Sequence, residues 1–350
     1  MIIQDFDFNK DNSVFVIAEL SANHNGSLET ALETIRAAKR AGANAIKLQT
    51  YTADTLTIQC DKDDFIIKSG SIWDGKTFYD LYKSAYTPWE WHEELFQCAK
   101  EEGLICFSSP FDKSAVDFLE NLNVPAYKIA SFEITDIPLI EYVASKGKPV
   151  ILSTGIATLE DIELALDACK RMGNNNIALL KCTSSYPAPI EEANMAMIPD
   201  FKERFDVIPG LSDHTLGSTV PIVATTLGAR IIEKHFILDR SIGGPDASFS
   251  MNEEEFMEMV KSVREAEKAI GQVNYEPTEK QIKGRAFSRS LYVVEDIRKG
   301  ELFTEENVRS IRPGFGLHPK YLRRLIGNYA ESDQSKGTRI DLSFLRKVNE

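Results

Sequence analysis

Patterns that identify several common protein classes are missing from this 350-residue sequence. Its five cysteines, at positions 60, 98, 106, 169 and 182, form no CxxC pair, so neither a disulfide framework nor a cysteine-based zinc site is indicated. No apolar run reaches the roughly 18 residues that a transmembrane helix needs. The acidic N-terminus, MIIQDFDFNK, does not resemble a signal peptide. These absences predict a cytoplasmic protein with reduced thiols and no membrane contact.

Two further absences narrow the choice of fold and of partner. No GxGxxG motif follows the first apolar run, and no GxSxG motif indicates a nucleophilic hydrolase. The net charge of −13 argues against a nucleic-acid-binding protein. This charge is uneven, because residues 279–350 carry +5 and residues 1–278 carry −18. We therefore expect no nucleic-acid partner and two parts of the chain that attract each other.

Eight short apolar runs alternate with amphipathic stretches from residue 14 to about residue 272. Several of the amphipathic stretches begin at Ser, Thr, Asp or Asn and end at Gly, which are helix start and stop signals. Eight strand–helix units in about 260 residues predict a (β/α)8 TIM barrel, with a doubly wound open sheet as the alternative. The predicted strands are residues 14–20, 45–50, 105–109, 126–131, 150–154, 177–183, 207–213 and 230–236.

The pattern changes after the last predicted barrel helix. Residues 272–284 are polar and contain a proline, which is typical of a linker. The residues that follow have short strand-like runs, several glycines and little helical periodicity. We predict a barrel domain over 1–271, a linker over 272–284 and a small β-rich domain over 285–350.

Chemically useful side chains stand at the end of every predicted strand. The strand ends of a TIM barrel form one mouth, where the active site lies, and long loops such as 50–87 cover that face. The set is rich in hydroxyls and lysines, which bind phosphate or carboxylate groups. An anion site is therefore predicted, with a Schiff-base lysine as the alternative. The lysines are Lys47, Lys128, Lys181 and Lys234.

Two histidines end consecutive predicted strands. His214 and His235 are 21 residues apart, which is one strand–helix step. Because neighbouring strands lie about 5 Å apart, both imidazoles can bind one divalent metal and leave positions open for water and substrate. The alternative is that each histidine only hydrogen-bonds to a neighbour. We expect a metal site.

Nine motifs stand in the barrel part of the chain: IAELSANHNG, KLQT, FSSPFD, AYKIASFEITDIPL, GKPVILSTGIATLEDI, CTSSYPAP, GLSDHTLG, EKHFILDR and GGPDASFS. Together they resemble the motifs of the sialic-acid synthase family. A later segment, RSLYVVEDIRKGELFTEENVRSIRPGFGLHP, resembles the antifreeze-like (SAF) domain of the same family. This resemblance implies a TIM barrel followed by a SAF domain. It also implies a transferase that joins phosphoenolpyruvate to the open-chain aldehyde of an acetamido sugar and releases phosphate.

Two segments resemble one branch of this family. KDDFIIKSGSIWDGKTFYDLYKSAYTPWEWHEELF and GGPDASFSM are similar to the branch that makes pseudaminic acid from 2,4-diacetamido-2,4,6-trideoxy-L-altrose. Ala247 stands where sialic-acid synthases usually have histidine, which counts against N-acetylmannosamine as the acceptor. The alternatives are a synthase of N-acetylneuraminic or legionaminic acid, an aldolase or another phosphoenolpyruvate-condensing enzyme, and a non-enzymatic carbohydrate-binding protein.

The resemblance also implies roles for single residues. It places Mn²⁺, with Mg²⁺ or Co²⁺ as substitutes, on His214 and His235. Glu19 is the best candidate for a general acid or base, and the alternative is a structural carboxylate paired with a lysine. Tyr186 is a weaker candidate for sugar binding. Gln49, Glu133 and Asp246 match positions near the acceptor sugar or the metal. Phosphoenolpyruvate is expected on Lys47, Ser109, Lys128, Ser131, Ser153, Ser184 and Ser212.

The small domain is expected to complete the site. Arg312 stands just before Pro313 and Gly314, and the resemblance implies that this arginine reaches the sugar site of the partner subunit in a domain-swapped homodimer. The opposite charges of the two parts favour such docking. The linker of about 13 residues spans roughly 40 Å if extended. The alternative is a solvated surface arginine.

Overall fold

The computed structural model describes residues 1–70 and 72–345. The chain divides into two compact units, Met1–Gly271 and Gln272–Glu350. The last five residues of the predicted small domain, 346–350, lie outside the described residues. None of the described helices is long and apolar enough to cross a membrane.

The first unit contains a closed barrel of eight parallel strands, in the order β10-β3-β4-β5-β6-β7-β8-β9. The predicted TIM barrel is therefore confirmed, and the open-sheet alternative is wrong. Each strand coincides with one predicted apolar run to within a few residues. The strands are Phe15–Glu19 (β3), Ala45–Thr50 (β4), Ile105–Pro110 (β5), Tyr127–Ile129 (β6), Val150–Ser153 (β7), Ile177–Cys182 (β8), Ile208–Asp213 (β9) and Ile231–His235 (β10).

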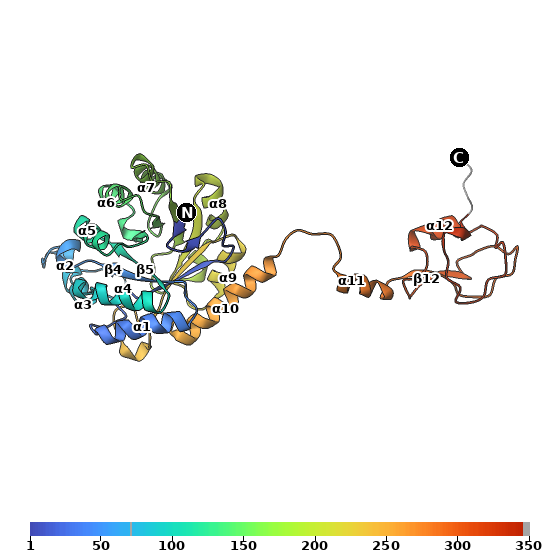
Figure 1. Ribbon diagram of the computed structural model, residues 1–350, viewed down its shortest axis with the longest axis horizontal. Coiled ribbons are helices and arrows are strands. Elements are labelled where there is room, and N and C mark those ends of the chain that lie inside the picture. The colour runs from blue at the N-terminus through green and yellow to red at the C-terminus, as the bar shows by residue number, and fades with distance from the viewer. Residues whose placement is uncertain (71, 346–350) are drawn as a thin grey trace. The chain divides into compact units, whose positions relative to one another are not determined.

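Helices surround the barrel, as Figure 1 shows. Their starts follow the predicted signals, because the side chains of Ser27, Asp112 and Thr158 accept hydrogen bonds from backbone N–H groups of the first turn. Their apolar faces pack on the outside of the strands in two large clusters. The helices are Leu28–Arg40 (α1), His92–Glu101 (α4), Lys113–Asn121 (α5), Ile137–Ala144 (α6), Leu159–Arg171 (α7), Met197–Phe205 (α8), Thr219–Thr226 (α9) and Glu253–Ile270 (α10).

A separate core fills the inside of the barrel. Two short strands, Ile2–Ile3 (β1) and Phe6–Asp7 (β2), form an antiparallel hairpin at the N-terminus. Ile3 and Phe8 are almost fully buried and pack with Phe15, the first residue of β3. The N-terminal end of the barrel is thus closed by apolar side chains, so the polar groups are left for the opposite end.

The long loop after β4 has a structure of its own. It contains the helices Ala53–Leu56 (α2) and Phe78–Ala85 (α3) and the 3₁₀ turn Asp63–Phe65 (η1). The side chains of Thr52 and Thr77 cap the two helices. An antiparallel bridge joins Ile66 to Thr77. This segment therefore has regular secondary structure and is not an irregular loop.

The second unit has a small sheet. Ser290–Val293 (β11) pairs antiparallel with Val308–Ile311 (β12), and isolated bridges extend the pairing. Its helices are Glu279–Gly284 (α11) and Leu322–Leu325 (α12). A core of its own includes Leu291, Phe303 and Ile340, each at most 2% exposed.

The predicted linker is not wholly extended. Residues 279–284 form α11, because Thr278 and Gln281 cap each other's backbone N–H groups in a capping box. A helical residue advances about 1.5 Å, against about 3.3 Å in an extended chain. The reach of roughly 40 Å that the sequence suggested is therefore too long.

Close packing inside the barrel leads to a stability prediction. A Cβ at Gly210, in β9, would lie 2.8 Å from the carbonyl oxygen of Ile231 and closer still to the side chain of Leu180. We expect Gly210→Ala to lower the free energy of unfolding by about 1–3 kcal/mol, because backbone atoms cannot move aside cheaply. Urea titration followed by circular dichroism measures this change.

The matched control is Gly284→Ala. Gly284 lies in α11 and has open space around the position of its Cβ. Because alanine favours a helix over glycine, this control should not destabilise its unit. Equal stability of Gly210→Ala and the parent protein would contradict the packing argument.

Candidate active site

A cavity of about 800 Å³ opens at the C-terminal ends of the barrel strands. Most of the residues predicted for the site line it. Ser109, Ser184 and Arg312 are not among its lining residues. The predicted residues that it brings together are Glu19, Lys47, Gln49, Lys128, Ser131, Glu133, Ser153, Tyr186, Ser212, His214, His235 and Asp246.

Strand register explains why these side chains meet. In the parallel barrel His235 pairs with Glu19, and Glu19 pairs with Lys47. Residues in register on neighbouring strands point to the same face. The last residues of β10 and β3 and the middle of β4 therefore present a histidine, a carboxylate and an ammonium side by side.

Four buried charges form the floor of the cavity. The Lys47 Nζ lies 2.7 Å from Glu19 Oε2 and 3.4 Å from Glu233 Oε1. The Lys128 Nζ lies 3.3 Å from the same Glu233 oxygen. Gln49 donates a hydrogen bond to Glu19 Oε1 at 2.9 Å. The predicted alternative for Glu19, a carboxylate paired with a lysine, thus describes its position correctly but does not exclude a chemical role.

Burial and charge shift the pKa values of this floor in opposite directions. Burial raises the pKa of Glu19, although Lys47 partly offsets it. Burial would also raise the pKa of Glu233, but Lys128 and Lys47 together hold it below its usual value. Burial lowers the pKa of Lys128. Burial acts the same way on Lys47, but Glu19 and Glu233 raise the net pKa above its usual value. Glu19 is therefore the carboxylate of the floor that is most easily protonated.

Glu233 is a charged residue of the cavity that the sequence analysis missed. It is 4% exposed, lines the cavity and accepts a hydrogen bond from Ser212 Oγ at 3.1 Å. Its position could have been found, since Glu233 and His235 are two residues apart on one strand and share a face. In the apolar run that contains Glu233, only the last two polar residues, Lys234 and His235, were predicted to belong to the site.

Side chains alternate between the two faces of a strand, and two of the lysines predicted for the site point away from the cavity. Lys234 lies between Glu233 and His235 and points to the other side of β10, where its Nζ lies 2.5 Å from Asp213 Oδ2. Lys181 Nζ donates to the Cys182 carbonyl oxygen at 2.7 Å and lines a separate small pocket. Neither lysine lines the large cavity. Of the four lysines predicted for the site, only Lys47 and Lys128 line this cavity.

Hydroxyl groups stand beside the two lysines. Ser109 Oγ accepts from Lys47 Nζ at 3.4 Å, although it does not line the cavity. Ser153 Oγ is buried and has no hydrogen-bond partner. At Gly155 an added Cβ would collide with Ser184 Oγ and Ser131 Oγ. The absence of a side chain at Gly155 thus lets those two hydroxyls lie close together.

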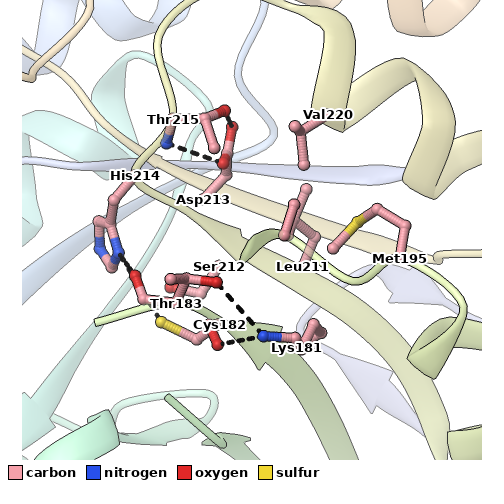
Figure 2. A pocket seen from close by; sticks show the side chains of 11 residues that line it. Lys181, Cys182, Thr183, Met195, Leu211, Ser212, Asp213, His214, Thr215 and Val220 are labelled. Carbon is pink, nitrogen blue, oxygen red and sulfur yellow. Dashed lines mark hydrogen bonds between the residues drawn. The ribbon is translucent and has the colours of Figure 1, made fainter. Parts of the chain in front are cut away.

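The two predicted histidines face each other. Their ring centroids are 5.3 Å apart. His214 Nδ1 contacts the Thr183 carbonyl oxygen at 3.0 Å, as Figure 2 shows. The Cys182 Sγ lies 3.7 Å from the same nitrogen. A histidine held through Nδ1 in this way keeps Nε2 available for another ligand, which is how metal-binding histidines are commonly held.

One ring nitrogen of His235 is free to bind a ligand. Its Nδ1 is buried without a hydrogen-bond partner and lies 3.8 Å from Asp246 Oδ2. Burial and the neighbouring His214 and Lys47 hold the pKa of His235 well below its ordinary value, so it is neutral and able to bind a metal. Among residues 1–70 and 72–345, however, no three His, Cys, Asp or Glu side chains are grouped closely enough to hold an ion.

Aromatic rings pack around the histidine pair. The Tyr186 ring centroid lies 4.5 Å from that of His214 and 6.5 Å from that of His235. Phe249 lies 5.0 Å from His235 and is 2% exposed. These rings hold the imidazoles in place and keep water from one side of them.

The remaining predicted residue lies in the second unit. Arg312 is exposed there and directly follows β12. The structure therefore leaves its predicted role at a partner subunit untested.

The sequence of this chain matches two known families and several known proteins. The NeuB family matches residues 34–275, and the SAF domain matches residues 288–346. A pseudaminic acid synthase of Campylobacter jejuni is 52% identical over 97% of this chain and 98% of that protein. A pseudaminic acid synthase of Helicobacter pylori is 49% identical over 90% of this chain and 93% of that protein.

A solved structure agrees with these matches. The crystal structure of an N-acetylneuraminic acid synthetase from Leptospira borgpetersenii is 32% identical, with a TM-score of 0.69. The similarity covers 78% of this chain and 90% of that one. The resemblance to the sialic-acid synthase family is thus confirmed: the chain belongs to the NeuB family and carries a SAF domain after its barrel.

Proposed function

We propose that this chain condenses phosphoenolpyruvate with 2,4-diacetamido-2,4,6-trideoxy-L-altrose to give pseudaminic acid and phosphate. The observation that carries the reaction type is the cavity floor, where two buried lysines and a group of hydroxyls lie beside a pair of facing histidines. The choice of sugar follows from the relatives of about half identity, which are pseudaminic acid synthases.

Phosphoenolpyruvate binds at the lysine side of the cavity. Lys47 and Lys128 supply positive charge to its phosphate and carboxylate groups. The Ser153 hydroxyl, which has no partner in the protein, gains one from the ligand. The other hydroxyls proposed for this ligand are those of Ser109, Ser131, Ser184 and Ser212.

The acceptor aldehyde binds at the histidine side. His214 and His235, with Asp246 beside them, are the residues that would hold a divalent metal, for which we propose Mn²⁺, with Mg²⁺ or Co²⁺ as substitutes. A bound divalent ion supplies Lewis-acid polarisation of the aldehyde. Gln49, Glu133 and Tyr186 line the same cavity and orient the sugar.

Glu19 is the residue that transfers protons in this proposal. The new carbon–carbon bond forms between C3 of phosphoenolpyruvate and the aldehyde carbon, water adds at C2, and the C–O bond to phosphate breaks. Glu19 lies between the lysine and the histidine sides, because it pairs in register with both Lys47 and His235. From there it can take a proton from the attacking water or give one to the forming hydroxyl.

The alternatives predict different products. Synthases of legionaminic or N-acetylneuraminic acid use the same floor and differ only in the acceptor. An aldolase releases no phosphate. A carbohydrate-binding protein has no use for two buried ammonium groups, which are expensive to desolvate without a function.

The metal role is tested by removal and by substitution. We expect chelation, or His235→Ala, to lower phosphate release by about 100-fold or more, since Lewis-acid stabilisation is worth several kcal/mol. Continuous phosphate assays with and without added Mn²⁺ measure the loss. His318→Ala, an exposed histidine of the second unit, is the control. Full turnover in metal-free buffer would rule out the metal.

The identity of the acceptor sugar is tested by measuring the mass of the product. The protein is incubated with phosphoenolpyruvate, Mn²⁺ and one candidate sugar at a time. We expect the altrose derivative to give pseudaminic acid with a higher kcat/KM than N-acetylmannosamine, in keeping with Ala247 in the GGPDASFS segment. A higher kcat/KM for N-acetylmannosamine would reject this acceptor while leaving the reaction type intact.

We also propose that two chains share each site, with Arg312 of the partner subunit holding the acceptor through its planar guanidinium. Inactive His235→Ala and Arg312→Ala proteins are mixed under conditions that allow subunit exchange. A mixed dimer collects both changes in one site and leaves the other intact, so we expect up to half of parental activity per mixed dimer. No recovery despite exchange, shown by native mass spectrometry, would mean that Arg312 does not act on a partner's site.

A further inference from the structure

The cavity has two chemically different sides. The strand ends supply the charged floor, whereas the segment between β4 and α4 supplies a row of apolar side chains. We call this row the apolar wall; its members are Leu56, Ile66, Ile67, Trp73, Phe78 and Leu81. None of these residues takes part in the chemistry proposed above.

The apolar side chains of the segment lie inside and its polar side chains lie at the rim. Ile67 and Leu81 are 4% and 8% exposed. Asp63, Asp64 and Lys68 also line the cavity but are exposed. Leu56, Ile66, Trp73 and Phe78 are partly exposed and line the cavity, so a ligand there meets a hydrocarbon surface on this side.

The wall is held rigidly against the reacting groups. Trp73 Nε1 donates a hydrogen bond to the carbonyl oxygen of Pro245 at 3.3 Å, and Pro245 directly precedes Asp246. The Trp73 ring centroid lies 5.5 Å from that of Tyr186, which in turn contacts His214. At the other end of the segment Tyr82 packs on Tyr51 at 5.9 Å.

We infer that the apolar wall selects the acceptor sugar, favouring one that presents methyl groups where other sugars present hydroxyls. This inference rests on the proposed function, in which the acceptor carries a C6 methyl group and two acetamido methyl groups. An apolar surface gains free energy by covering a methyl group. A hydroxyl placed there loses its hydrogen bonds to water and finds no partner.

The size of the selection follows from the same physics. A hydrophobic pocket discriminates between ligands that differ by one small group by about 10-fold to 200-fold. We therefore expect the parent protein to prefer the 6-deoxy sugar over its 6-hydroxy analogue, 2,4-diacetamido-2,4-dideoxy-L-altrose, by a factor in this range. The analogue that lacks the 4-acetamido group provides a second comparison.

The variants Trp73→Ala and Leu56→Ser test the wall. In both we expect discrimination against at least one of the two analogues to fall to less than about a third of its parental factor, while the KM for phosphoenolpyruvate stays within about twofold. Trp73→Phe keeps the aromatic face and loses the hydrogen bond to Pro245, so it should keep the discrimination. The matched control is Ile72→Ala, since Ile72 is 55% exposed and does not line the cavity.

Saturation-transfer NMR gives a second readout that does not depend on turnover. We expect the sugar's methyl protons to receive saturation from the parent protein and from Ile72→Ala, and much less from Trp73→Ala. If phosphate release with this sugar is absent but the methyl contacts depend on Trp73, the proposed function is wrong, whereas binding of methyl groups by the apolar wall is supported. Unchanged discrimination and unchanged saturation in both Trp73→Ala and Leu56→Ser would contradict selection of the sugar by the apolar wall. An equal loss of kcat/KM for all three sugars would also overturn it.

Discussion

The mouth of this barrel depends on the mutual neutralisation of four buried charges. Glu19, Lys47, Lys128 and Glu233 are each at most 4% exposed. A buried charge without a partner is destabilised by several kcal/mol, so none of the four is stable there alone. Glu233 stabilises both lysines, and Lys47 bridges the two carboxylates. A ligand that brings negative charge to the lysines therefore enters a site already organised to receive it.

Under the proposed function, the strand ends carry out the reaction and the segment between β4 and α4 selects the sugar. Residues at the ends of strands are held by the barrel's hydrogen bonds, so their positions vary little, and these carry the charges and the histidines. The wall belongs to a segment between β4 and α4 that has its own helices and is attached through Trp73 and Tyr51. Such a segment can change its side chains without disturbing the floor.

The errors of sequence reasoning have a common cause. Lys234 and Lys181 were counted in the mouth because they end apolar runs, yet a strand sends alternate side chains to opposite faces. Glu233 was overlooked because only the last two polar residues of its run, Lys234 and His235, were assigned to the site. Which face is the inner one depends on how the sheet closes, and a single strand does not contain that information.

The sequence alone determined the number of strands, their order along the chain, the capped helix starts and the convergence of polar residues at one end. These follow from local periodicity and from turn and cap residues, which act over a few positions. The tertiary structure decided that Lys47 and Lys128 share Glu233 and that Ser131 and Ser184 meet at Gly155. It also brought Trp73 to Pro245, 172 residues away. Such contacts depend on barrel closure, which no local pattern encodes.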